Sequence, residues 1–140
     1  MNSDIPPTYE GLLRQCGLPP LPFLGKGMQC LVFAEGNERV VKLYSQAAGI
    51  ENLQRLMRFY ASLDTSVVSF ALPQIIAVES IKEHILVKEK RMRGTSPTLD
   101  YLQNLTTHEL EIYFQHYVDC LFQIQEITTS FLQPGEPLDL

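Results

Sequence analysis

The chain has 140 residues and a mass of 15.9 kDa; 45% of its residues are hydrophobic, 19% are charged, and the formal net charge is -5. This is the size of one domain with a single hydrophobic core, and it leaves no room for two large lobes. The acidic balance argues against a broad nucleic-acid surface, which draws its affinity from clustered Lys and Arg. The N-terminus lacks the pattern of a signal peptide, and no later stretch approaches the roughly 18 apolar residues of a membrane span. We therefore expect a cytoplasmic protein that binds neither nucleic acid nor a membrane.

The cysteines are few and widely spaced. Cys16, Cys30 and Cys120 form an odd set without a C-x-x-C pair. Such a set indicates neither a disulfide framework nor a zinc site. We predict that all three are buried, reduced thiols.

The first part of the chain, residues 1–22, reads as a leader with one short helix over 9–14. Gly17 and the prolines that follow it end this helix, because proline cannot continue a helical hydrogen-bond pattern. The side chains predicted to be buried are Leu12, Leu13 and Cys16.

Short β runs follow at 23–25, 30–34 and 39–44. The second and third runs are separated by a Gly36-Asn37 pair, which supplies the positive φ of a tight hairpin turn. These runs predict a β-meander. Helical spacing then appears between residues 47 and 63, where one apolar stripe is formed by Ile50, Leu53, Met57 and Tyr60.

Two further strands are predicted at 74–79 and 84–89, and Gly94 to Pro97 ends the sheet region. The last long element is a helix over 106–128, which Thr106 can cap with Glu109 as its capping-box partner. Its apolar stripe comprises Leu110, Phe114, Tyr117, Leu121 and Ile124.

The predicted fold class is therefore α+β. A five-stranded antiparallel sheet with one packed helix, in the order β-β-β-α-β-β, is followed by a linker and a long C-terminal helix. The predicted divisions are a leader at 1–22, the sheet-containing lobe at 23–93, a linker at 94–105, the helix at 106–133 and a tail at 134–140.

Two features in the strands can carry binding chemistry. Gly25 and Gly27 lie in a strand-to-strand turn, where glycine lets the backbone approach an anion closely. Taken alone, such a pair is more often a tight turn. Lys42 lies in the most apolar strand and must either reach water or pair with an anion, since an unpaired buried ammonium is costly. The predicted strand order places Lys42 within reach of whatever the glycine turn holds.

These residues carry a family resemblance over about residues 23 to 128. The ordered run resembles the N-terminal lobe of the aminoglycoside phosphotransferase family, small-molecule kinases with a protein-kinase-like fold. The matching residues are Leu24-Gly25-x-Gly27, Val32-Phe33, Val40-Val41-Lys42-Leu43-Tyr44, Pro73-Gln74-Ile75, Leu86-Val87-x-Glu89 and Gly94-Thr95.

The resemblance implies ATP as the ligand, with Mg²⁺ expected only alongside a complete C-terminal lobe. In that family the glycine-rich turn covers the phosphates, the third-strand lysine holds them, and a hinge after the fifth strand contacts adenine. The nucleotide-binding residues that the resemblance implies are Gly25, Lys26, Gly27, Val32, Lys42, Glu51, Glu89, Lys90, Arg91 and Met92.

The sequence departs from this family at three points. Cys30 stands where a third glycine would be, which is a mild change. Glu51 is the one glutamate available on the helix to orient Lys42, but it points nearly opposite the apolar stripe, so a pair with Arg55 one turn away is the alternative. No His begins an H-x-D triplet, and the aspartates are isolated. We therefore expect that this chain does not catalyse phosphoryl transfer by itself.

Three interpretations remain open from the sequence. The first is the nucleotide-binding lobe of an aminoglycoside-phosphotransferase-like kinase, truncated before the catalytic loop. The second is a non-catalytic interaction module that binds a protein, or a second copy of itself, through the helix at 106–128 or through the basic run at 88–93. For that basic run, a solvated strand end is the simpler explanation. The third is an unrelated α+β domain in which the glycine pair is only a turn.

Overall fold

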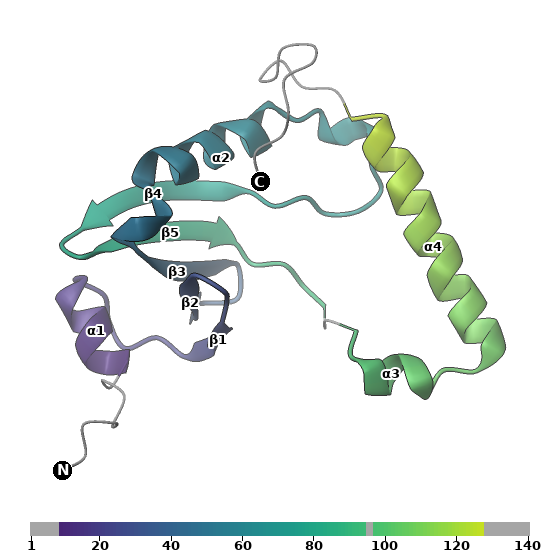
Figure 1. Ribbon diagram of the computed structural model, residues 1–140, viewed down its shortest axis with the longest axis horizontal. Coiled ribbons are helices and arrows are strands. Elements are labelled where there is room, and N and C mark those ends of the chain that lie inside the picture. Colours follow the sequence, from purple (N-terminus) through teal and green to yellow (C-terminus); the bar gives the residue numbers. More distant parts are fainter. Residues whose placement is uncertain (1–8, 95–96, 128–140) are drawn as a thin grey trace. The chain divides into compact units, whose positions relative to one another are not determined.

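A computed structural model describes residues 9–94 and 97–127 of the chain. It confirms the predicted α+β class and the order β-β-β-α-β-β (Figure 1). Short 3-10 turns lie at Gln46–Ala48 and Thr65–Val67. The elements are α1 (Tyr9–Gln15), β1 (Phe23–Lys26), β2 (Cys30–Glu35), β3 (Arg39–Ser45), α2 (Ile50–Ser62), β4 (Ile75–Ile81), β5 (His84–Lys90), α3 (Leu99–Gln103) and α4 (Thr107–Gln125).

The five strands form one antiparallel sheet in the order β1-β2-β3-β5-β4. The pairs β1–β2, β2–β3 and β4–β5 are antiparallel hairpins. Strand β3 pairs with β5 rather than with β4, because β4 lies at the edge of the sheet. The β2–β3 turn uses Gly36 at φ 68°, as the sequence predicts, and the β4–β5 turn uses Lys82 at φ 54°. The crossing from β3 to β5 brings residues that are 39 to 51 positions apart onto neighbouring strands.

The sheet has a helix on each face, and side chains that alternate along the strands divide the core in two. We call the side that packs against α1 the α1 face; its buried cluster is Leu13, Cys16, Phe33, Val41, Leu43 and Leu86. We call the other side the α2 face; its buried cluster is Leu53, Ile75, Ile85 and Val87, with Tyr44, Met57 and Tyr60 packed against it. The buried side predicted for α1 and the apolar stripe predicted for α2 therefore both face the sheet.

The leader helix α1 is part of this core. Leu13 and Cys16 are buried and Leu12 is half-buried, which agrees with the predicted side of the helix. The prediction of three buried thiols is correct only for Cys16. Cys30 and Cys120 are half-buried, because Cys30 begins β2 at a position that does not pair with β1, and Cys120 lies on a helix without buried residues. All three thiols are free.

A set of side-chain contacts anchors the 3-10 turn that precedes α2. The Gln46 side-chain amide nitrogen lies 2.9 Å from the Ser80 Oγ and 3.2 Å from the carbonyl oxygens of both Lys82 and His84. These contacts join the 3-10 turn before α2 to the β4–β5 hairpin. They lie on the polar rim, where the residues are exposed.

The described residues divide into two compact units. Unit 1 contains residues 9–61 and 73–91, and unit 2 contains 62–72, 92–94 and 97–127. This division differs from the predicted one: the leader helix belongs with the sheet, and residues 62–72 group with the later helices. In the described part of the chain, no helix is long and apolar enough to cross a membrane.

Unit 2 is built on α4, whose start agrees with the prediction. The Glu109 amide donates to the Thr106 Oγ1 at 3.1 Å, so Thr106 caps the helix. The amide and the hydroxyl of Ser69 contact the Gln123 Oε1 at 2.6 and 3.1 Å and tie residues 62–72 to α4. The short helix α3, capped by Thr98, was not predicted. The predicted helix residues beyond 127 lie outside the described part.

Candidate functional site

The candidate site lies on the α2 face, where the strand register aligns four residues across the sheet. Gly25 on β1 pairs with Val32 on β2, Val32 pairs with Lys42 on β3, and Lys42 pairs with Val87 on β5. Directly paired residues of neighbouring strands project their side chains from the same face. The sheet therefore places Lys42 beside Val32 and in one row with the glycine of the turn.

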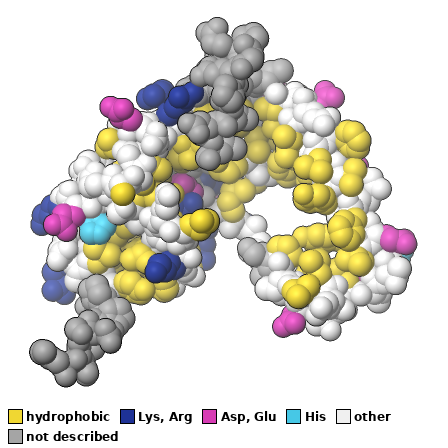
Figure 2. All heavy atoms as spheres, viewed as in Figure 1, with side chains coloured by type: hydrophobic (Ala, Val, Ile, Leu, Met, Phe, Trp, Pro, Cys, Tyr) yellow, Lys and Arg dark blue, Asp and Glu magenta, His cyan; other side chains and the backbone are white. Residues whose placement is uncertain are grey.

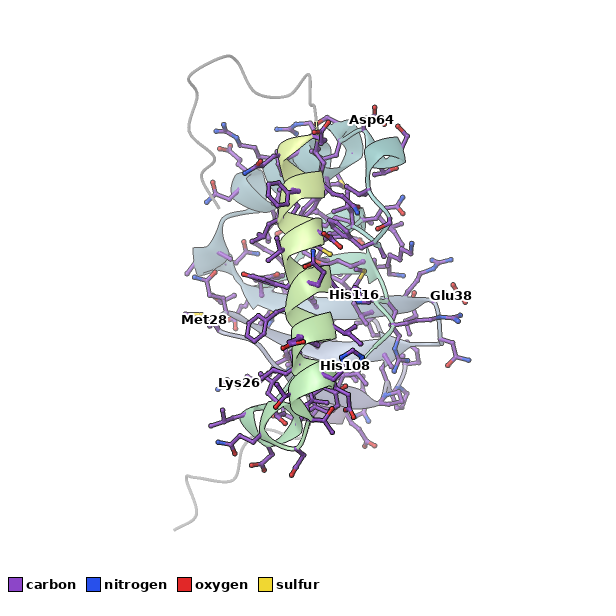
Figure 3. All side chains as sticks on the ribbon, turned by 90° about the vertical axis from the view of Figure 1, so that its right-hand side faces the viewer. Lys26, Met28, Glu38, Asp64, His108 and His116 are labelled. Carbon is purple, nitrogen blue, oxygen red and sulfur yellow. The ribbon has the colours of Figure 1, made fainter. Side chains whose placement is uncertain are left out.

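The glycine turn is closed by a backbone hydrogen bond and leaves open space beside Gly25. The Gly27 amide donates to the Cys30 carbonyl at 2.8 Å. A Cβ on Gly25 would have no atom within 4 Å, whereas one on Gly27 would lie 3.1 Å from the Cys30 Sγ. The space next to the Gly25 Cα is thus open to a ligand, while a side chain at Gly27 would make a tight contact with the Cys30 thiol. Lys26 and Met28 are exposed in this turn and project away from the sheet (Figure 3).

Lys42 is partly buried and is held by a carboxylate from β5. Its Nζ lies 2.9 Å from the Glu89 Oε2, and the two side chains are 26% and 15% exposed. Glu89 is two residues beyond Val87, the cross-strand partner of Lys42, so both charges project from the α2 face as diagonal neighbours. The family resemblance places Glu89 in the hinge, and the sequence does not predict this ion pair.

The structure does not bring Glu51 to Lys42. Glu51 lies in the first turn of α2 and is exposed, whereas Leu53 of the same helix is buried against the sheet. Among the described residues, the ion pair of Lys42 is with Glu89 and not with Glu51. The geometric reason is the one expected from the helical period, since Glu51 projects away from the stripe that faces the sheet.

Two residues beside Lys42 were not predicted to belong to the site. Tyr44 is two positions further along β3 and pairs with Cys30, so both share the α2 face with Lys42. Burial, followed by the neighbouring Cys30 thiol and Glu89 carboxylate, raises the pKa of Tyr44 above its usual value. Tyr44 is therefore a neutral O–H group at physiological pH. The place of Tyr44 beside Lys42 on the α2 face follows from the strand register, which the sequence alone does not determine.

The predicted hinge begins as an extension of the sheet. The Lys90 amide donates to the Gln74 carbonyl and the Arg91 amide to the Glu38 carbonyl, both at 2.9 Å. The Arg91 guanidinium also donates to the Gly36 carbonyl at 3.0 Å. These two amides are thus occupied by protein partners. Met92 is the first residue after this extension and belongs to unit 2.

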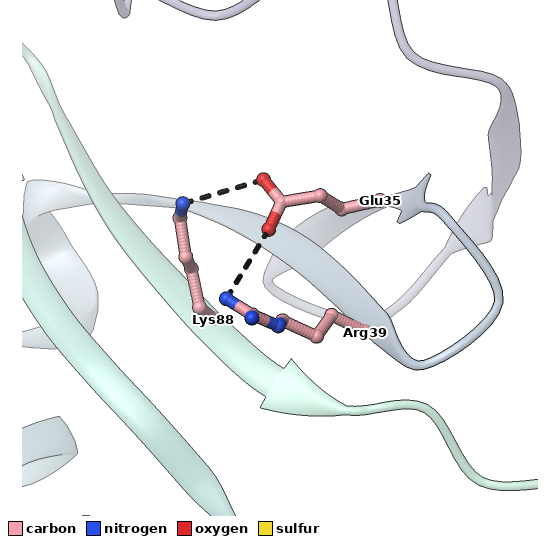
Figure 4. A network of polar contacts seen from close by, with 3 residues as sticks. All are labelled: Glu35, Arg39 and Lys88. Carbon is pink, nitrogen blue, oxygen red and sulfur yellow. Dashed lines mark ion pairs between the residues drawn. The ribbon is translucent and has the colours of Figure 1, made fainter.

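The first residue of the basic run at 88–93 is paired with a carboxylate. Lys88 lies on the α1 face, where its Nζ is 3.3 Å from Glu35, and Arg39 approaches the same carboxylate at 3.9 Å (Figure 4). Lys88 and Glu89 project from opposite faces because they are consecutive in a strand. Glu35 thus compensates part of the positive charge on the α1 face, and Glu89 compensates Lys42 on the other.

The described residues also bear on metal binding. Among residues 9–94 and 97–127, no group of three or more His, Cys, Asp or Glu side chains is arranged to hold a metal ion. His108 and His116 lie at different heights along α4 (Figure 3). The described part of the chain therefore offers no resident metal site from its own side chains.

The sheet, α2 and the glycine turn together define a kinase-like N-terminal lobe fold. A solved structure similar to this chain is the ADP-bound aminoglycoside phosphotransferase APH(2'')-Ib, with a TM-score of 0.65 and 18% sequence identity; the match covers 98% of this chain and 45% of that chain. The streptomycin–ATP complex of APH(2'')-IIa matches with a TM-score of 0.44 and 20% identity over 71% of this chain and 34% of that chain. This chain therefore spans less than half the length of these proteins.

No protein-family model matches the sequence, and no curated protein matches it. The likeness to the solved structure is one of fold. It agrees with the resemblance drawn from the ordered glycine turn, lysine strand and fifth strand.

Proposed function

We propose that unit 1 is the nucleotide-binding lobe of an aminoglycoside-phosphotransferase-like kinase, with ATP as its ligand. The observation that carries this proposal is the row formed by Gly25, Val32 and Lys42 on the α2 face. It combines open space over a glycine with the ammonium group of a partly exposed lysine. An anion with an attached apolar ring system is the ligand class that such a surface suits.

Each residue of the site has a proposed role. The backbone of Gly25, Lys26 and Gly27 would cover the phosphates, and Lys42 would hold them by charge-assisted hydrogen bonds. Val32 would supply an apolar contact for the base. The hinge residues Glu89 and Lys90 end β5, and Arg91 and Met92 follow it where the chain leaves the sheet.

Binding is proposed without catalysis by this chain alone. Phosphoryl transfer needs a residue that orients the attacking hydroxyl and side chains that hold Mg²⁺ near the phosphates. The 140 residues contain no H-x-D triplet. Among the residues of the site row, none can take the role of that catalytic aspartate.

The test is titration of the full chain with ATP, comparing wild type, Lys42→Ala and Lys88→Ala. Each variant removes one strand lysine that is ion-paired with a glutamate, but Lys88 lies on the opposite face. We expect Lys42→Ala to weaken ATP binding by about tenfold or more, the scale of a lost charge-assisted hydrogen bond. Lys88→Ala should bind as wild type. Equal affinity in wild type and Lys42→Ala would remove the nucleotide role.

A second candidate function is self-association through α4, favoured by its exposed apolar side chains. Hydrophobic side chains gather over α3 and α4 (Figure 2), and no residue of α4 is buried. The exposed members on one side include Phe114, Tyr117, Val118 and Leu121. Sedimentation of wild type, Leu121→Glu and the polar-side control His116→Glu tests this candidate. A monomer in all three would exclude it.

A further inference from the structure

We propose that Glu89 is a built-in competitor of the nucleotide phosphates for Lys42, so that ATP binds by taking this lysine from the carboxylate. The contact that suggests it is the 2.9 Å ion pair between the Lys42 Nζ and the Glu89 Oε2. The inference rests on the proposed function, because it assumes that phosphates bind over the α2 face.

The carboxylate is held in place by the sheet. Glu89 pairs with Val40 on one side and with Ile75 on the other, so its backbone is fixed between two strands. Its side chain is largely covered, whereas Lys42 retains more exposure. Glu89 is therefore a permanent neighbour of Lys42, whereas a carboxylate on an exposed loop would approach only intermittently.

The charge balance of this face explains the competition. Glu89 neutralises the single positive charge of Lys42, so the pair offers an incoming phosphate little net attraction. Lys88 and Arg39 share Glu35 on the opposite face. A polyphosphate must then displace the Glu89 carboxylate or lie close to a like charge, and either process weakens binding.

Glu89 could instead position Lys42 for the phosphates, and the two roles change ATP affinity in opposite directions. A carboxylate that only positions the lysine for phosphate would strengthen ATP binding, and its neutralisation would weaken it. A competitor has the reverse effect. The effect of a competitor is also confined to ligands that carry phosphate, since adenosine has no charge to compete for Lys42.

The experiment is calorimetric titration of the full chain with ATP and with adenosine, in wild type, Glu89→Gln and Glu35→Gln. Both variants remove one negative charge from a lysine-bound glutamate, on opposite faces of the sheet. We expect Glu89→Gln to bind ATP more tightly, by up to about fivefold, the scale of a partly exposed ion pair. The gain for ATP should exceed any change in adenosine affinity, and Glu35→Gln should match wild type. The gain should vanish in the Lys42→Ala background.

The remaining outcomes separate this inference from the function on which it rests. Equal ATP affinity in wild type and Glu89→Gln, with weaker binding by Lys42→Ala, overturns the competition and keeps the nucleotide site. Weaker ATP binding by Glu89→Gln, or an equal gain for adenosine, also overturns it. Absence of ATP binding in every variant removes both proposals. Thermal unfolding checks that the variants fold, and Glu89→Met provides a second neutral side chain with the same expected gain.

Discussion

At the scale of single residues, Lys82 occupies a backbone conformation that is costly for its type. Among the described residues it is the non-glycine residue with a positive φ, at 54° in the two-residue turn between β4 and β5. Side chains with a Cβ are disfavoured there by about 1 to 2 kcal/mol. Glycine avoids this cost but loses more chain entropy on folding.

We predict that Lys82→Gly raises the free energy of unfolding by up to about 1 kcal/mol, the difference between these two effects. Glu83→Gly, at the neighbouring turn position without a positive φ, should lower it instead. Urea unfolding of the two variants measures the difference. A loss of stability in Lys82→Gly equal to that in Glu83→Gly would contradict the strain argument.

Asp64 provides a pH-dependent contribution in unit 2. Its Oδ1 accepts from the Ser66 hydroxyl at 2.6 Å and from the Ser66 amide at 3.0 Å, and these hydrogen bonds lower the pKa of the carboxyl. Because the pKa is lower in the folded state, the unfolded state binds more protons as the pH falls. The stabilisation is therefore complete above the ordinary aspartate pKa of about 3.9 and is lost below it.

We predict that wild type loses stability relative to Asp64→Asn as the pH is lowered from about 5 to about 2, because the asparagine does not titrate. Thermal unfolding across this range measures the trend. Glu111→Gln, at an exposed position of α4, controls for the change in net charge. Parallel curves for wild type and Asp64→Asn would show that the Ser66 hydrogen bonds do not couple to folding.

At the scale of elements, α1 shows how a short helix depends on packing. It has seven residues, which is too short for a stable isolated helix in water. Leu13 places it in the core of the α1 face, and Tyr9 stacks on Phe23 with ring centroids 4.5 Å apart. These contacts make the helix part of unit 1.

We predict that Leu13→Ala lowers the free energy of unfolding by about 2 to 5 kcal/mol, as expected for truncation of a fully buried leucine. Leu13 is 1% exposed, whereas its neighbour Arg14 is exposed. Arg14→Ala should therefore leave stability within about 0.5 kcal/mol of wild type. Chemical denaturation followed by far-ultraviolet circular dichroism gives both values, and equal stability of Leu13→Ala and wild type would show that α1 is dispensable.

The sequence predicts local elements well because their signals are local. The Gly36 turn, the apolar stripe of α2 and the Thr106 cap each depend on a few neighbouring residues, and each appears in the structure. Helix α3 was missed because five residues provide little more than one turn of periodicity. The Lys42–Glu89 pair was missed because it requires β5 to lie beside β3, a neighbour relation that consecutive strands do not suggest.

At the scale of the whole molecule, the buried residues are unevenly distributed. Every buried hydrophobic residue of the described chain lies in unit 1, and α4 of unit 2 contains none. Local stability follows burial, because regions with few buried contacts open at lower free energy. The two units should therefore differ in the stability of their backbone hydrogen bonds.

We predict that the central amides of β3 and β5 exchange with deuterium at least about tenfold more slowly than those of α4, after correction for intrinsic rates. Native-state hydrogen exchange of the full chain provides the measurement. The exposed turn at 82–83 serves as the fast-exchange reference. Amides in α4 that exchange as slowly as those in β3 would show that this helix is covered in solution.

The contacts of Gln46 carry a consequence for motion. Its side chain touches three oxygen atoms of the β4–β5 hairpin, and Gln46 is only four residues before the start of α2. A rotation of α2 about its first turn would therefore break these contacts unless the hairpin moved with it. Conformational change in this lobe is then expected to displace α2 and the β4–β5 hairpin together, and β3 should follow them because it pairs with β5 along its whole length.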